Sequence, residues 1–89
     1  MKRLAQVATA GFEERNDVLI TVEPIASGIE VALKSNVARQ YGEHITALIE
    51  ELVKAQGFDG VKVTAVDRGA WDYTIKARVI GALGRGMAE

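Results

Sequence analysis

His44 is the single histidine of the chain, and its neighbour Glu43 makes an acid–base pair conceivable. A lone imidazole on the polar face of a helix is usually solvated, so we expect neither catalysis nor metal binding there. Asp67 and Asp72 flank a turn that contains glycine, and they could act as paired carboxylates. Aspartate in such a turn commonly accepts hydrogen bonds from backbone N–H groups, and we favour this capping role.

Other candidate features lie in the last third of the sequence. Gly81, Gly84 and Gly86 have a spacing that superficially resembles a phosphate-binding loop. Such a loop lies between a strand and a following helix, whereas these glycines lie at the end of the chain. Trp71 and Tyr73 are interpreted as core or interface aromatics. Residue types and spacing alone therefore predict no catalytic residues and no metal site.

The composition indicates one small domain, with 89 residues of which 48% are hydrophobic. A formal charge of −1 argues against nucleic-acid binding, which favours a strong basic excess. The absence of cysteine excludes disulfides, thiolate nucleophiles and cysteine-based zinc sites, and suits the cytoplasm. No apolar run approaches the roughly 18 residues of a membrane span, and the first residues lack the apolar core of a signal peptide. We expect a soluble cytoplasmic protein.

One long amphipathic helix is predicted over Val37–Gln56. Its apolar side chains recur at steps of three and four, which places them on one stripe of a helix. Ser35 or Asn36 can provide the N-cap oxygen, and Gly57 stands where a helix favours a left-handed residue. The stripe that we expect to pack on a sheet comprises Val37, Tyr41, Ile45, Leu48, Ile49, Leu52 and Val53.

Four segments alternate apolar and polar residues with the period of a strand. They span residues 17–24, 29–34, 61–66 and 71–79, and turn residues separate the first pair and the last pair. The predicted fold is α+β, with two β-hairpins joined by the helix (ββαββ) in a two-layer sandwich. Residues 1–16 show no sustained period and are expected to form a flexible N-terminal arm, which leaves residues 17–89 as a single domain.

Several short motifs occur in a fixed order along most of the chain. They are Glu14, Asp17-Val18, Val22-Glu23-Pro24, Gly28-Ile29-Glu30-Val31, Ser35-Asn36-Val37, Gln40-Tyr41-Gly42, Val66-Asp67-Arg68-Gly69-Ala70, Asp72 and Ala77-Arg78. In their order and spacing, from about Ala10 to Gly84, the chain resembles the acyl carrier (gamma) subunit of citrate lyase.

The resemblance implies a carrier without an active site of its own. In that family a serine near the N-terminus bears phosphoribosyl-dephospho-coenzyme A through a phosphodiester, which makes the carrier a phosphoprotein. The terminal thiol holds acetate as a thioester. The alpha subunit exchanges acetyl for citrate, and the beta subunit cleaves the citryl thioester to oxaloacetate. A mobile tether would let one thioester visit both active sites without dissociating.

The sequence departs from the family pattern at the attachment position. The family segment reads roughly Gly-Thr-Leu-Glu-Ser-Gly-Asp-Val, whereas here Arg15 stands in the place of the serine, flanked by Glu14 and Asp17. A guanidinium group cannot form the phosphodiester. Ser27 and Thr9 are alternative attachment positions.

Three explanations of Arg15 remain open: a relative that has lost the group and keeps a docking role, a relative modified elsewhere, or a family member altered at this position. An alternative from another class is a small interaction or scaffold domain unrelated to citrate metabolism. Its anion-facing patch would consist of Arg68, Lys76, Arg78 and Arg85.

Overall fold

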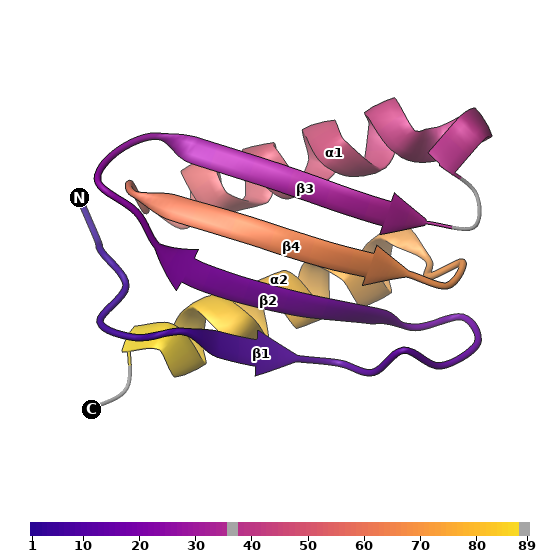
Figure 1. Ribbon diagram of the computed structural model, residues 1–89, viewed down its shortest axis with the longest axis horizontal. Helices are drawn as coiled ribbons and strands as arrows, with labels where there is room; N and C mark the ends of the chain where they lie inside the picture. Colours follow the sequence, from indigo (N-terminus) through magenta and orange to yellow (C-terminus); the bar gives the residue numbers. More distant parts are fainter. Residues whose placement is uncertain (36–37, 88–89) are drawn as a thin grey trace.

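In the computed structural model, which describes residues 1–35 and 38–87, two helices cover one face of a four-stranded sheet (Figure 1). The elements in chain order are β1 (Ala8–Ala10), β2 (Val18–Pro24), β3 (Ile29–Ser35), α1 (Ala38–Ala55), β4 (Val61–Asp67) and α2 (Asp72–Met87). The α+β class is therefore confirmed. The predicted ββαββ order differs in detail, because the last element is a helix and the fourth strand is β1.

The sheet order is β1-β2-β4-β3, which differs from the two predicted hairpins. β4 pairs antiparallel with β2 and parallel with β3, so β4 separates the two strands that were expected to pair with each other. Parallel neighbours require a crossover, and α1 provides it by running from the end of β3 to the start of β4. The predicted strand ranges and their alternation are otherwise close to β2, β3 and β4.

The core lies between the sheet and the helices. β2 and β4 bury every second side chain, as the alternation predicts, while α1 contributes one stripe of apolar residues. Fully buried side chains at the centre include Val18, Ile20, Val22, Ile49, Val53, Val61, Val63, Ile75 and Val79.

From Ala38, its first described residue, the helix α1 follows the prediction closely. Asn36 and Val37 precede it. Those two residues, and with them the predicted helix start and one of its N-cap candidates, lie outside the described part. The C-terminal end of the helix is as predicted, because Gly57 has a φ of 80°. The N–H of Gly57 donates to the carbonyl of Lys54, and the N–H of Phe58 donates to the carbonyl of Val53. Among the described residues of the predicted stripe, Tyr41 is the exception, because 55% of its surface is exposed.

The prediction of a strand over residues 71–79 was wrong. The same stretch begins α2, and its buried residues Ile75, Val79, Ala82, Leu83 and Gly86 recur at helical steps. The period-two pattern would bury Trp71 and Tyr73, whose side chains are 64% and 72% exposed. Helical spacing therefore accounts for the buried residues of this segment, and the alternation was coincidental.

Glycines in α2 allow the N-terminal segment to pack closely on the helix. A Cβ at Gly86 would lie 2.5 Å from Leu4 Cδ2, and the carbonyl of Gly86 accepts hydrogen bonds from the N–H groups of Ala5 and Gln6. A Cβ at Gly81 would lie 3.6 Å from Ala10 Cβ, which is an ordinary van der Waals distance, and a Cβ at Gly84 would meet no described atom within 4 Å. Close packing therefore favours glycine at position 86 and does not account for the other two glycines.

Part of the expected arm, residues 1–16, belongs to the sheet in this structure. β1 pairs antiparallel with β2, and Leu4, Ala8 and Ala10 are buried in the core. The sequence did not reveal β1 because three residues are too few to show a period. The mobility of the arm stays a prediction, and it now concerns mainly the residues between β1 and β2. Within the described ranges, no helix is long and apolar enough to cross a membrane.

Candidate functional site

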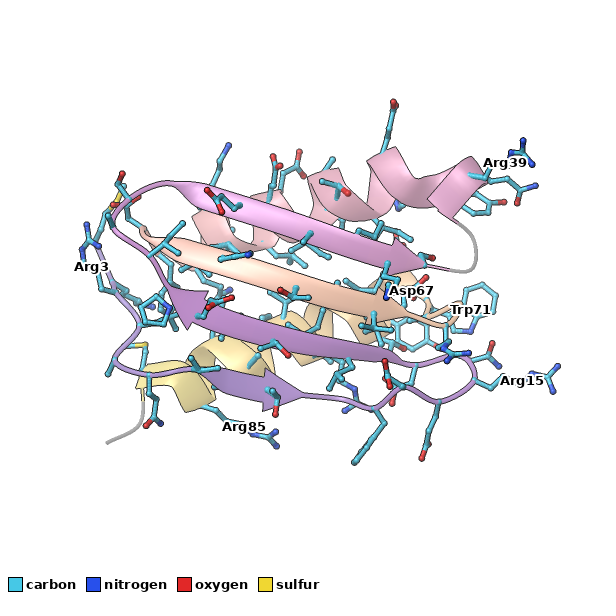
Figure 2. All side chains as sticks on the ribbon, viewed as in Figure 1. Arg3, Arg15, Arg39, Asp67, Trp71 and Arg85 are labelled. Atoms are coloured by element: carbon cyan, nitrogen blue, oxygen red, sulfur yellow. The ribbon has the colours of Figure 1, made fainter. Side chains whose placement is uncertain are left out.

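The loop between β1 and β2, residues 11–17, contains the position that the family resemblance singles out. It projects from one end of the sheet, and Arg15 points outward from its tip (Figure 2). Glu13, Glu14 and Arg15 are all exposed. Gly11 has a φ of 88°, and a Cβ there would collide with the carbonyl oxygen of Val18, so only glycine fits where the loop leaves β1.

Asp17 anchors the other end of this β1–β2 loop. Its carboxylate accepts two hydrogen bonds from the Arg78 guanidinium, from Nε and from Nη2, each at 3.1 Å. It also accepts one from the N–H of Val18 at 2.7 Å. The Arg78 hydrogen bond is the main cause that lowers the pKa of Asp17, and burial opposes it.

Backbone hydrogen bonds join the same loop to the turn after β4. The N–H of Asn16 donates to the carbonyl of Arg68 at 2.8 Å, and the N–H of Arg68 donates to the carbonyl of Asp17 at 3.0 Å. Asn16 itself has a φ of 63°. The base of the loop is therefore held at both ends, while its tip is presented to solvent.

The structure does not bring the alternative attachment residues to this loop. Ser27 lies in the connection between β2 and β3, at the opposite end of the sheet (Figure 1). The seven residues of β2 separate the two ends by about 20 Å, at roughly 3.3 Å per residue. Thr9 is exposed on β1 itself. Ser35 donates to the carboxylate of Asp67 at 2.7 Å, at the end of β3.

The two aspartates that could have formed a carboxylate pair have separate roles. Asp67 is buried and accepts hydrogen bonds from the hydroxyl of Ser35 and from the N–H of Ala70, which is the predicted capping role. Asp72 lies in the first turn of α2, and its carboxylate accepts a hydrogen bond at 2.8 Å from His44 Nε2 in the tautomer that carries the proton there. His44 therefore contacts Asp72 rather than forming the considered pair with Glu43.

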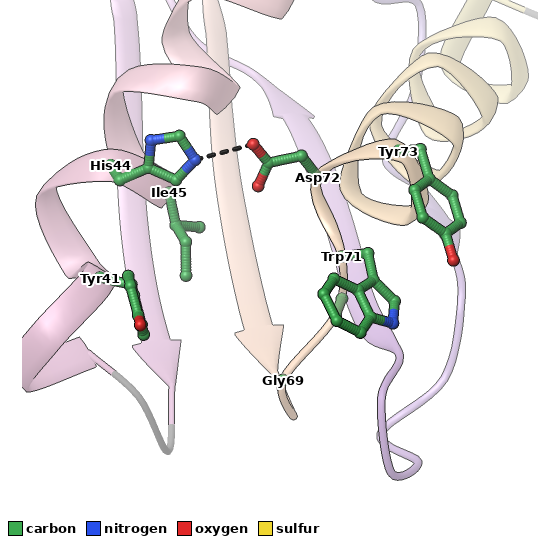
Figure 3. Close-up of a pocket in the computed structure, with 8 residues that line it drawn as sticks. Tyr41, His44, Ile45, Gly69, Trp71, Asp72 and Tyr73 are labelled. Carbon is green, nitrogen blue, oxygen red and sulfur yellow. Dashed lines mark hydrogen bonds and ion pairs between the residues drawn. The ribbon is translucent and has the colours of Figure 1, made fainter.

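A cleft opens beside the hydrogen bond between His44 and Asp72, between the first turns of α1 and α2 (Figure 3). Its volume is about 830 Å³. It lies at the same end of the molecule as the β1–β2 loop, because Trp71 and Arg15 both project from that end (Figure 2). We call it the aromatic cleft; its lining residues are Tyr41, His44, Ile45, Gly69, Ala70, Trp71, Asp72 and Tyr73.

Two other candidate features from the sequence are a metal site and the anion-facing patch. In the described part of the chain, no set of three or more His, Cys, Asp or Glu side chains is arranged to hold a metal ion. Of the basic residues considered as an anion-facing patch, Arg78 is engaged by Asp17, and Arg85 donates to the carbonyl of Thr9 at 2.8 Å.

Comparison with known proteins assigns the chain to a protein family. Residues 5–86 match the family designated ACP and described as malonate decarboxylase delta subunit. The chain belongs to this acyl carrier family. The match includes β1, the β1–β2 loop with Arg15, and α2 almost to its end.

Individual relatives are named as acyl carriers of citrate lyase. The chain is 46% identical over 86 residues to the citrate lyase acyl carrier protein of Latilactobacillus sakei subsp. sakei, covering 97% of this chain and 85% of the relative. It is 48% identical over 82 residues to that of Streptococcus uberis, covering 92% and 81%. These values confirm the resemblance drawn from the motifs.

A solved structure shares the fold. The chain superposes on a component of a Pseudomonas malonate decarboxylase hetero-tetramer, solved in complex with malonate, with a TM-score of 0.69. The alignment covers 94% of this chain and 87% of the other at 21% identity. At this identity the similarity establishes a common fold.

Proposed function

We propose that the chain is the acyl carrier (gamma-type) subunit of a cytoplasmic citrate lyase-type complex. It has no catalytic role of its own and docks on alpha and beta subunits that perform the chemistry. The observation that carries this proposal is the 46% identity over nearly the whole chain to a protein named as a citrate lyase acyl carrier. The family's structural neighbour, which comes from a hetero-tetramer, supports a role inside a larger assembly.

The residue at position 15 does not fit the prosthetic group that the resemblance implies. Phosphoribosyl-dephospho-coenzyme A is held through a phosphodiester to a serine oxygen. The Arg15 guanidinium has no hydroxyl oxygen and carries five N–H donors. The chain is therefore proposed to bear no phosphodiester-linked group at this position and to act as a carrier-like docking subunit.

The remaining loop supports a docking role that survives without the group. The contact of Asp17 with Arg78 keeps the base of the β1–β2 loop in place, and Gly11 retains the backbone conformation that the turn needs. Attachment at Ser27 would present the group from the opposite end of the sheet. It would require a different approach of the partner subunits, and we do not favour it.

Association with the lyase subunits tests this proposal. An affinity-tagged chain is co-expressed with the alpha and beta subunits of a citrate lyase from its own host, and the acyl carrier protein of Latilactobacillus sakei with its own subunits serves as the positive control. We expect both large subunits to co-elute with the chain in size-exclusion chromatography. A chain that elutes alone, while the control assembles, contradicts the proposed function.

A further inference from the structure

Two large aromatic side chains stand on opposite sides of the aromatic cleft (Figure 3). Tyr41 comes from the first turns of α1, and Trp71 immediately precedes α2; the two residues are 55% and 64% exposed. Neither residue is needed to fill the core, since the buried stripes of both helices begin at Ile45 and Ile75. Exposed aromatic groups gathered at a concave site are typical of a binding surface.

The floor between these rings is apolar and open. Ile45 is 3% exposed and closes the back of the cleft, and Ala70 presents only a methyl group. Among the described residues, the atom nearest to a would-be Cβ at Gly69, where φ is 83°, is Asn16 Oδ1 at 3.7 Å, so the glycine adds no side chain to the floor. The volume of about 830 Å³ lies within the usual range for small-molecule sites, about 300–1,000 Å³.

Polar groups converge at one margin of the cleft. The hydrogen bond between His44 and Asp72 joins α1 to α2 beside the two aromatic side chains. This contact uses His44 Nε2 and Asp72 Oδ2. The second carboxylate oxygen of Asp72 is an acceptor, and His44 Nδ1 is a donor or an acceptor according to its tautomer. A ligand with an N–H donor on its edge can therefore hydrogen-bond to the Asp72 carboxylate at this margin.

We propose that the aromatic cleft binds, non-covalently, a flat heteroaromatic ring that carries an amino group, of the size of a purine. The faces and edges of Tyr41 and Trp71 offer stacked and edge-to-face contacts to such a ring. The amino group donates to the Asp72 carboxylate. This site goes beyond the proposed carrier function, since it uses neither Arg15 nor a covalent attachment.

The fluorescence of Trp71 provides a direct test, because it is the single tryptophan of the chain. The full-length chain is titrated with adenosine, with excitation at the red edge of the tryptophan band. We expect saturable quenching. Tyr41→Ala should weaken the apparent affinity at least tenfold. Phe12→Ala, which removes another exposed aromatic side chain that does not line the cleft, should leave the affinity unchanged.

A matched ligand pair separates ring stacking from recognition of the amino group. Purine riboside has the same ring without the amino group, so it should bind more weakly than adenosine, and Asp72→Asn should reduce this difference. Circular dichroism checks that each variant is folded. Quenching that rises linearly without saturation overturns the proposal, as does an unchanged affinity in Tyr41→Ala. Binding of adenosine monophosphate or inorganic phosphate without binding of adenosine also overturns it, because the ligand would then be an anion.

Discussion

Asp17 and Arg78 are separated by 61 positions in the chain, yet their two hydrogen bonds close the base of the β1–β2 loop. Both residues belong to the motifs that carried the family resemblance. Their pairing was invisible in the sequence, because it depends on α2 being a helix that runs beneath β2. At the scale of single residues, the sequence therefore identified Asp17 and Arg78 as motif residues, but it did not show that they contact each other.

Acid should weaken this contact and with it the folded state. Arg78 lowers the pKa of Asp17 below its unfolded value, so the stabilisation is fully present above the unfolded pKa of about 3.9 and is lost as the pH falls through the folded pKa. Urea unfolding of the wild type between pH 7 and pH 2.5 should show this loss. Asp17→Asn should be less stable at neutral pH and lose less on acidification.

Glu13→Gln provides the control for this measurement, since it removes a carboxylate from the same loop without touching Arg78. It should keep the pH dependence of the wild type. An Asp17→Asn variant whose stability falls with pH as steeply as that of the wild type would show that the pair does not link folding to protonation.

At the scale of elements, the sequence predicted α1 and the three long strands well, because their apolar residues had a clear period. It failed over residues 71–79, where aromatic and β-branched residues favour a strand and an alternation fits by chance. The apolar spacing of Ile75, Val79 and Leu83 was the competing signal, and glycines obscured it.

The strand order was also hidden, since turn residues cannot show that β4 inserts between β2 and β3. The aromatic cleft was missed for a related reason: Tyr41 and Trp71 come from different elements.

The orientation of α1 gives a prediction about stability. Ile49 is fully buried against the sheet, so Ile49→Ala should lower the free energy of unfolding by about 2–4 kcal/mol through loss of burial and cavity formation. Tyr41→Ala on the same predicted stripe should cost about 0.5 kcal/mol or less, because Tyr41 is largely exposed. Urea denaturation of both variants measures the difference. Equal midpoints would contradict the placement of the helix.

At the scale of the whole molecule, the two candidate sites lie at one end. The β1–β2 loop and the aromatic cleft share that end, and the connection with Ser27 lies at the other (Figures 1 and 2). The N-terminal segment contributes to this arrangement, because Leu4 packs on α2 and β1 pairs with β2. The N-terminal segment therefore joins the sheet at β1, whereas residues 12–16 of the loop are all exposed.

Amide hydrogen exchange tests this division of the N-terminal segment. Amides of residues 8–10 that pair with β2 should be protected, and those of residues 12–15 should exchange rapidly because this stretch is exposed. The amides of β4 at the centre of the sheet serve as the protected reference. Rapid exchange throughout residues 1–16 would instead restore the fully mobile arm expected from the sequence.

The most direct test of the account is the intact mass of the chain after co-expression with the prosthetic-group transferase and the precursor of the family. The wild type should keep its unmodified mass, because Arg15 cannot accept a phosphodiester. Arg15→Ser should gain the mass of the group, since Glu14 and Asp17 retain part of the expected surroundings and the loop tip is exposed. An adduct on the wild-type chain, mapped by fragmentation to Ser27, Thr9 or Ser35, would contradict the loss of the group and indicate an ordinary carrier with a displaced attachment site.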